Sequence, residues 1–324
     1  MKKCVLLYTV VILLALVQMG AAEDGNGGQP GAFMDLTLGA RPAALGGAFT
    51  ALAEDGIGHF YNPAGSAQSR KNDVTFSYRA MHLGRRLGMT SVSIPAREQA
   101  RLSLFWVHAG TSDLEARDEQ GIILSSNSVS YSENMIGMNF SKGFIPELLL
   151  GGKVYYLQNN ISNINANTIG ADFGALVKLD MRKTFMAGTF PLLQFGLTAE
   201  RIGATYKWVT ASFWQSYGRE RGAAADEKFP INFRGGMALR NPNKYLLAFD
   251  FEASTASIVK THIGAEYSFN RNFTFRAGLD DMHPTAGFGL LKRMDKIAVR
   301  IDLSYLTDKV GEGDDVLVSF DVIF

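Results

Sequence analysis

The sequence predicts an all-β fold, a 14-stranded antiparallel transmembrane β-barrel with an N-terminal helical or irregular hatch in its lumen. Hydrophobic residues make up 47% of the 324 residues and aromatic residues 11%. After the leader, no uncharged apolar run reaches the roughly 18 residues that a spanning helix needs. Two patterns predict the barrel. Apolar and polar residues alternate along the chain, and short connections alternate with long ones. An exported chain with these features is typical of a closed barrel.

Residues 1–22 are predicted to be a signal peptide. Two lysines precede an apolar core at 5–19, and small residues lead to a cleavage site after Ala22. The one cysteine, Cys4, lies ahead of that core, so the mature chain would have no disulfide and no cysteine metal site. The net charge of +1 argues against a nucleic-acid partner.

Residues 23–72 are predicted to form the hatch, or plug. Small residues dominate 38–65, which reads LGARPAALGGAFTALAEDGIGHFYNPAG. A helix is expected over 43–53, where the Gly46–Gly47 pair suggests close packing against another surface. The sequence Asn62-Pro63-Ala64-Gly65 then turns the chain. We expect the hatch to enter the lumen from the periplasmic end of the barrel.

Residues 73–324 are predicted to form the barrel. Apolar and polar residues alternate with period 2, as in Val316, Val318 and Phe320 against Ser319 and Asp321. This pattern predicts fourteen strands, at 73–83, 86–95, 100–109, 133–142, 147–158, 168–180, 191–202, 229–240, 243–253, 259–269, 271–280, 284–293, 295–306 and 314–324.

The connections between these strands indicate a membrane barrel. Connections after even strands are mostly short, whereas the longest ones, at 110–132, 159–167 and 203–228, follow odd strands. Outer-membrane barrels have short periplasmic turns and longer extracellular loops. The chain also ends on an alternating strand with Phe324, which resembles the assembly signal of bacterial outer-membrane barrels.

The segment 38–65 resembles the hatch of FadL-like outer-membrane proteins, in which a Gly/Ala-rich helix precedes an Asn-Pro-Ala turn. With Gly39-Ala40-Arg41, then 44–48 and 62–65, it looks closest to the PorV/PorQ branch. The resemblance covers about 28 residues and implies a fourteen-stranded barrel with a luminal hatch. For FadL-type members it implies transport of hydrophobic molecules, and for the PorV branch it implies binding of C-terminal signals of secreted cargo.

If the apolar faces point to lipid, a set of charged side chains faces the lumen. These charges could give a wide pore its selectivity, but we expect them to pair with each other and with the hatch. Fourteen strands lie between the filled and the open sizes of barrel, so we predict a narrow or closed lumen. The lumen-facing set is Asp172, Lys178, Glu200, Arg234, Asp250, Glu252, Glu266, Arg276, Arg300 and Asp302.

Two groups of side chains are candidates for a ligand site. Aromatic and apolar residues of the hatch could line a pocket or could only pack the hatch against the wall. Aromatic residues in the outer connection could catch a ligand, or could contact lipid. The hatch candidates are Phe33, Leu36, Phe49, Phe60, Tyr61, Asn62 and Pro63. The outer-loop candidates are Trp208, Phe213, Trp214 and Tyr217.

The sequence carries no pattern typical of an enzyme. The five histidines show no metal spacing, and no G-x-S-x-G elbow is present. We therefore predict no catalytic residues, no metal site and no cofactor. The expected protein is a monomer of the bacterial outer membrane that takes up hydrophobic small molecules, such as long-chain fatty acids, past the hatch. Its expected partners are a hydrophobic small molecule or lipid, and outer-membrane lipid. The alternative is a PorV-like accessory barrel that works with secretion machinery.

Overall fold

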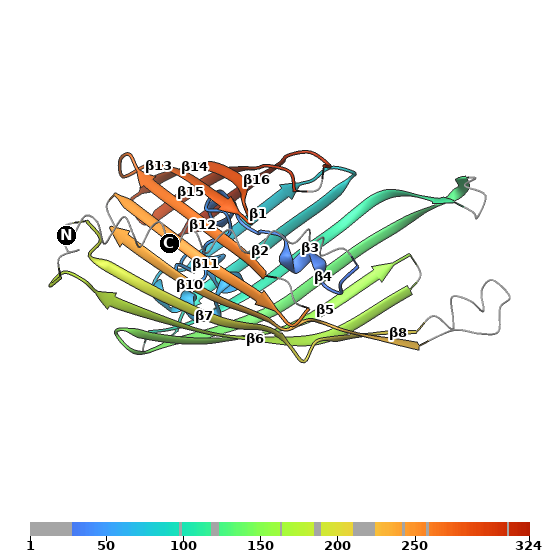
Figure 1. Cartoon of the computed structure of the whole chain (residues 1–324), viewed down its shortest axis with the longest axis horizontal. Coiled ribbons are helices and arrows are strands. Elements are labelled where there is room, and N and C mark those ends of the chain that lie inside the picture. Colours follow the sequence, from blue (N-terminus) through green and yellow to red (C-terminus); the bar gives the residue numbers. More distant parts are fainter. Residues whose placement is uncertain are drawn as a thin grey trace.

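The described part of the chain folds into a closed antiparallel barrel of fourteen strands (Figure 1). The computed structural model describes residues 28–324 except 97–98, 118–122, 163, 185–188, 210–223, 242–243, 257–258 and 310. Each strand pairs with its neighbour in the barrel order, and β1 closes the barrel on β16. The predicted closed antiparallel barrel of fourteen strands is confirmed. The barrel strands are β1 (Asp73–Ala80), β2 (Arg85–Pro95), β3 (Ala100–Arg117), β4 (Ile123–Ile145), β5 (Leu148–Ile161), β6 (Ile164–Asp180), β7 (Leu192–Ile202), β10 (Asn232–Asn241), β11 (Tyr245–Ser254), β12 (Val259–Ser268), β13 (Phe273–Asp280), β14 (His283–Met294), β15 (Ile297–Leu306) and β16 (Asp315–Ile323).

Two regions that the sequence predicts as long loops are largely strand. In 110–132, β3 and β4 continue as a hairpin with register shifts, which extends past the end of the barrel in Figure 1. In 159–167, β5 and β6 leave only residues 162–163 between them. The loop predictions were wrong here because polar residues predominate in both stretches of sequence, so period 2 does not reveal the strands.

A small hairpin stands apart from the barrel sheet. Within 203–228, which the sequence predicts as a loop, β8 (Thr205–Val209) pairs with β9 (Ala224–Lys228) as a separate two-stranded sheet. The wall is complete without it because β7 pairs directly with β10. This hairpin therefore adds to one end of the barrel without interrupting it.

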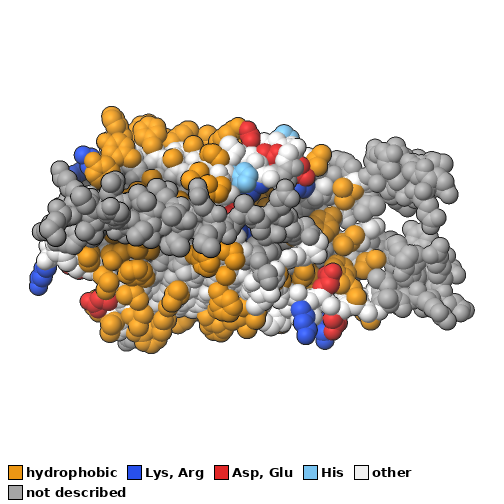
Figure 2. All heavy atoms as spheres, in the orientation of Figure 1, with side chains coloured by type: hydrophobic (Ala, Val, Ile, Leu, Met, Phe, Trp, Pro, Cys, Tyr) orange, Lys and Arg blue, Asp and Glu red, His pale blue; other side chains and the backbone are white. Residues whose placement is uncertain are grey.

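The outer face of the barrel is apolar. In β16, Val316, Val318 and Phe320 are exposed, whereas Ser319 and Asp321 are buried. Side chains alternate between the two faces of a strand, so the exposed apolar set faces outward and the buried polar set faces the lumen. Figure 2 shows hydrophobic side chains over much of the described body of the barrel, with charged ones towards its ends. Such a surface is suited to a lipid bilayer.

The N-terminal segment, residues 28–72, lies inside the barrel. The backbone N–H groups of Gly39 and Ala40 donate to Ser77 of β1 and Ser319 of β16. Ser77 and Ser319 are buried residues on the inner face of the wall, so these contacts place the segment within the lumen. Its short helices are η2 (Ala32–Asp35), α2 (Ala40–Ala44), α3 (Gly58–Tyr61) and η3 (Pro63–Gln68). Among the described residues, no helix is long and apolar enough to cross a membrane.

The N-terminal segment runs opposite to the predicted direction. Asp35 forms an ion pair with Arg201, near the end of β7 that leads to β8. Asn72 exchanges backbone hydrogen bonds of 3.0 Å with Phe324, at the end of the barrel that carries the tight turns. The first described residues therefore lie at the end with the long hairpins. The amino-acid pattern shows that the segment is compact but not which end it starts from.

The predicted helix over 43–53 is wrong. The helix α2 stops at Ala44, because Gly46 and Gly47 adopt left-handed φ angles of 65° and 83°. A Cβ on Gly46 would lie 2.4 Å from the carbonyl oxygen of Leu279, so the expected close wall contact is present. The glycine pair thus both ends the helix and lets the backbone touch β13.

Candidate functional site

Wall side chains hold the backbone of the N-terminal segment. The Asp250 carboxylate accepts hydrogen bonds from the N–H groups of Phe49 (2.8 Å) and Thr50 (2.7 Å). Within the segment, the Asn62 amide donates to the carbonyl oxygens of Thr50 (2.9 Å) and Ala175 (3.1 Å). These bonds satisfy buried backbone groups of an irregular segment that has few of its own. The predicted Asn-Pro-Ala turn therefore links the segment to the wall by a hydrogen bond.

Ion pairs hold the middle of the segment. The Arg41 guanidinium lies 2.8 Å from Glu54, 2.6 Å from Asp55 and 2.9 Å from Glu266 of β12. Arg300 of β15 lies 2.8 Å from the other Asp55 oxygen. Burial alone would raise the pKa of Asp55, but Arg300 and Arg41 outweigh it and hold this pKa well below its usual range. The Asp55 carboxylate is thus a charged bridge between the segment and two sides of the barrel.

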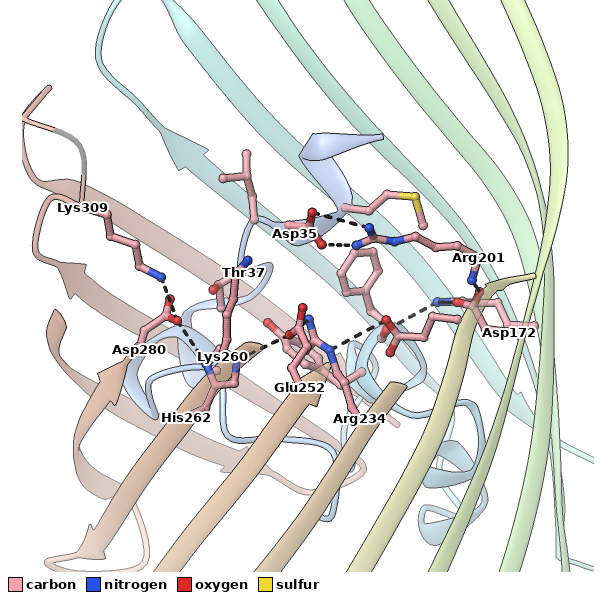
Figure 3. Close-up of a pocket in the computed structure, with 17 residues that line it drawn as sticks. Asp35, Thr37, Asp172, Arg201, Arg234, Glu252, Lys260, His262, Asp280 and Lys309 are labelled. Atoms are coloured by element: carbon pink, nitrogen blue, oxygen red, sulfur yellow. Dashed lines mark hydrogen bonds and ion pairs between the residues drawn. The ribbon is translucent and has the colours of Figure 1, made fainter. Parts of the chain in front are cut away.

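A second set of ion pairs lines a polar pocket in the lumen (Figure 3). Asp35 pairs with Arg201, and Arg234 lies 2.7 Å from Glu252. Asp280 lies 3.1 Å from His262, which in turn bonds the Gly46 carbonyl oxygen through its Nδ1 atom at 2.8 Å. Further pairs of the pocket include Lys153 with Asp172 (2.7 Å) and Lys309 with Asp280 (2.8 Å).

The free space in this pocket is about 30 Å³. That is roughly the volume of one water molecule in the liquid, whereas an apolar cavity that binds benzene measures about 150 Å³. This pocket is therefore too small for a small hydrocarbon in the state described. The charged side chains that were predicted to face the lumen line it. Most of them pair with each other or with the N-terminal segment, as in the Arg276–Asp302 pair at 2.7 Å.

One side of the lumen is apolar, which the sequence reasoning missed. Inward-facing residues of β2 to β5 pack with Phe33 and Met34 of the segment in one buried cluster. The prediction assigned every apolar face to lipid, but these strands are apolar on both faces. The signal was present in stretches without alternation, such as Leu104-Phe105-Trp106-Val107. The inward-facing wall residues are Leu87, Met89, Phe105, Val107, Met135, Tyr155 and Leu157.

Most of the predicted hatch residues belong to the apolar cluster or pack against it. Phe33 is buried in the apolar cluster, and Leu36 and Phe60 pack against it while half-buried. Phe49 and Tyr61 are buried and meet edge to face at 5.4 Å between ring centres. Asn62 and Pro63 lie at the opposite end of the segment from Phe33 and serve the wall contacts. The structure thus brings five of the predicted hatch residues into the apolar cluster or against it, namely Phe33, Leu36, Phe49, Phe60 and Tyr61.

The outer-loop prediction is covered only in part. Trp208 lies in β8, packs partly buried against the apolar cluster, and donates from its Nε1 atom to Glu227 at 2.7 Å. Phe213, Trp214 and Tyr217 lie outside the described residues. Two further aromatic residues of this region were not predicted as site residues. Tyr206 and Phe229 are buried in the cluster with ring centres 4.9 Å apart, and they cover the apolar wall at the outer end.

Comparisons with known proteins agree with the fold. A family model described as an uncharacterised protein family (UPF0164) matches residues 32–312. Comparison with curated proteins finds no match. Similar solved structures include the toluene transporter TodX of Pseudomonas putida, with 12% identity, a TM-score of 0.56, and 87% of this chain and 95% of TodX covered.

Two more solved structures share the architecture. A FadL homologue of Pseudomonas aeruginosa has 10% identity and a TM-score of 0.57, over 89% of this chain and 98% of the homologue. The monoaromatic hydrocarbon channel CymD has 12% identity and a TM-score of 0.56, over 88% and 96% of the two chains. At such low identities the likeness concerns the fold, which is that of FadL-type outer-membrane barrels.

Proposed function

This chain belongs to the uncharacterised protein family UPF0164, and we propose that it carries out passive uptake of hydrophobic small molecules across the outer membrane. The observation that carries the proposal is the apolar side of the lumen, where wall residues of β2 to β5 pack against Phe33 and Met34. A barrel that only spans a membrane needs apolar side chains outside, not inside. An apolar inner wall reduces the cost of moving a hydrophobic molecule through an otherwise charged lumen.

The mechanism follows from what fills the lumen. The N-terminal segment covers the apolar wall and leaves about 30 Å³ of free space in the adjoining pocket. A hydrophobic molecule would enter at the outer end, which Tyr206 and Phe229 cover, and would replace Phe33 on the wall. The segment would then act as a hatch, and its release from the wall would open the way to the periplasm. Each chain closes its own barrel, so the proposed unit is a monomer.

The substrate class includes long-chain fatty acids and aromatic hydrocarbons. TodX and CymD are described as a toluene transporter and a monoaromatic hydrocarbon channel. The alternative, a PorV-like accessory of protein secretion, predicts cargo C-terminal domains or a translocon among co-purifying proteins and no uptake of small molecules. Mass spectrometry of the protein isolated in mild detergent would separate the two.

The test is uptake of labelled oleate and labelled toluene by cells that carry the protein, with the variant Met135→Gln. Met135 is fully buried on the inner wall of β4, whereas Met138 of the same strand is 56% exposed on the lipid face. Glutamine has nearly the volume of methionine but adds a polar amide, so Met135→Gln makes the inner wall polar at little steric cost. The matched control is Met138→Gln, which changes the same residue type on the outer face.

We expect the wild type and Met138→Gln to take up at least one of the two labels above the empty-vector level, and Met135→Gln to be several-fold slower. Assembly of each variant is checked by its heat-dependent mobility in gels. Equal uptake by cells with and without the protein, for both labels, would refute the proposed function. Equal rates for the two assembled variants would refute the apolar wall as the route.

A further inference from the structure

The outer surface of the barrel has a hollow over β2 that differs from the rest of the apolar face. It encloses about 430 Å³ and is bordered by β16, β1, β2 and β3. Its floor is made of small outward-facing residues of β2, Gly88 and Thr90, and its sides are aromatic. Tyr78 of β1 is 54% exposed and Trp106 of β3 is 48% exposed, so both stand out from the wall.

The strand register explains this shape. Gly88 pairs with Tyr78 on one side and with His108 on the other. One step further into the membrane, Thr90 lies between Phe76 and Trp106 in the same way. Tall side chains on the flanking strands and short ones between them make a groove along β2. A Cβ on Gly88 would meet atoms only at 3.8 and 3.9 Å, so the groove is open there.

A positive charge marks one end of the groove. Arg86, the next outward-facing residue of β2, is exposed, and no carboxylate of the described residues forms an ion pair with it. It lies beside Gly110, where a Cβ would be 3.7 Å from Arg86 Nε and 3.2 Å from His108 Nε2. Two nitrogen-bearing side chains therefore converge over a glycine at the mouth of the groove. An anionic group at the mouth of the groove would be within reach of both side chains.

The groove lies at the level where a lipid headgroup meets the acyl region. Trp106 donates from Nε1 to Asn134 at 3.1 Å, and His108 Nδ1 shares the same Asn134 oxygen at 3.0 Å. Tryptophan and tyrosine with such polar contacts are typical of the membrane–water boundary. Arg86 is on the side of the outer hairpins, and Val92 and Leu104 continue the apolar surface in the other direction.

We propose that this groove binds one phospholipid of the membrane, with an acyl chain along Gly88 and Thr90 and the phosphate at Arg86. The groove runs over β2 from Arg86 to Thr90, which corresponds to about 13 Å of strand. A single guanidinium matches the single charge of a phosphodiester. A lipid A molecule, with more than one phosphate, would leave charge unpaired here. The site is on the outer face, so it is separate from the proposed uptake route.

The test is native mass spectrometry of the full-length mature protein in mild detergent, titrated with phosphatidylglycerol. The variants are Gly88→Leu, which fills the groove, and Arg86→Gln, which removes the charge. The matched controls are Gly235→Leu, at an outward-facing glycine of β10 whose Cβ would meet Leu197 at 3.5 Å, and Arg293→Gln, at an exposed arginine of β14. Parallel titrations use oleate and lipid A.

We expect one phosphatidylglycerol to be retained by the wild type and by both controls, with an affinity about tenfold lower in Gly88→Leu and Arg86→Gln. The same affinity in all five proteins, or preferential retention of lipid A or oleate, would overturn the proposal. A second readout needs no change in the groove. In a protein with Trp208→Phe and Trp214→Phe, phosphatidylglycerol with brominated acyl chains should quench Trp106 at a lower lipid fraction than brominated oleate does.

Discussion

At the scale of single residues, Gly46 decides how closely the N-terminal segment approaches the wall. Its φ of 65° favours glycine, and a Cβ there would come within 2.4 Å of the Leu279 backbone. The left-handed conformation alone costs a non-glycine residue about 1–2 kcal/mol, and backbone atoms of β13 cannot move aside as a side chain could. The close contact is thus available to glycine alone.

Gly46→Ala should therefore loosen the segment without disturbing the barrel. We expect faster hydrogen exchange at the N–H groups of Phe49 and Thr50, which donate hydrogen bonds to the Asp250 carboxylate in the wild type. Exchange in β7 and β11 should stay unchanged. The control is Gly235→Ala, since Gly235 faces outward with ordinary space around it. Unchanged exchange at Phe49 and Thr50 in an assembled Gly46→Ala variant would show that this contact does not hold the segment.

His59 makes the docking of the segment dependent on pH. Its ring is fully buried, with its centre 5.0 Å from that of Phe105. Burial lowers the pKa of His59 to about 3, with further contributions from Lys153 and Arg101. In an unfolded segment the pKa would be about 6.5. His59 therefore stays neutral while the segment is docked. Its contribution to the stability of docking is fully present above pH ~6.5 and is lost progressively as the pH falls towards about 3.

Acidification from pH 7.5 to 5 should therefore increase hydrogen exchange in 55–65, after correction for intrinsic rates. In His59→Gln, which does not titrate, this increase should be much smaller. The comparison with the variant removes effects of pH on other groups, such as Asp55, whose pKa lies below this window. An identical pH response in the wild type and His59→Gln would exclude His59 as the cause.

At the scale of elements, the barrel strands were predictable and the N-terminal segment was not. Period 2 identifies a strand wherever one face meets lipid and the other meets polar groups, as in β15 and β16. The helix expected over 43–53 fails because Gly46 and Gly47 take conformations that contact with β12 and β13 imposes, and local propensity contains no such information. The direction of the segment, set by pairs such as Asp35–Arg201, is equally invisible in the sequence.

The same reasoning explains which residues beside the apolar wall were predicted as site residues. Phe33, Leu36 and Phe60 were predicted because apolar residues are conspicuous in a small-residue segment. The inner wall around Met135 and Leu157 was missed because alternation was taken to mean one apolar face for each strand. Only pairing of strands in the closed barrel brings the inward residues of β2 to β5 together.

The hairpin of β8 and β9 is expected to cover the outer end of the apolar wall. Tyr206 and Phe229 pack there, and the barrel closes through β7 and β10 without the hairpin. Replacement of residues 205–228 by a short Gly/Ser linker should leave the barrel assembled and should speed uptake of labelled oleate or toluene. Assembly is checked by heat-dependent gel mobility. Slower uptake by an assembled deletion variant would mean that the hairpin captures the ligand instead of covering the site.

At the scale of the whole molecule, the barrel combines an apolar outer face, a charged lumen and one apolar strip inside it. The free space of about 30 Å³ beside the segment is too small for a steady stream of hydrated ions. Porins of sixteen to eighteen strands leave an aqueous channel, whereas this barrel has fourteen strands in its described part and a filled lumen. Closure of the lumen and the proposed selectivity for hydrophobic molecules are thus two consequences of one arrangement.

The closed lumen predicts low ion conductance. In planar bilayers at 1 M KCl, the wild type should show no long-lived open channel of porin size. A variant that lacks residues 28–68 should conduct, since the segment fills the lumen in the described structure. Its assembly is verified by the heat-dependent gel shift. A large steady conductance in the wild type would contradict a lumen sealed by the segment.

The central claim is that a hydrophobic molecule passes only when the N-terminal segment leaves the wall. The most direct measurement uses Ala40→Cys with Ser319→Cys, a pair that contacts through the Ala40 N–H and Ser319 Oγ at 2.8 Å. Cys4 lies in the predicted signal peptide, so these would be the only thiols of the mature chain. Uptake of labelled oleate and toluene is measured with the disulfide formed and again after reduction, and each single-cysteine variant serves as control. We expect oxidation to stop uptake and reduction to restore it. Uptake at the wild-type rate with the disulfide fully formed would contradict the central claim.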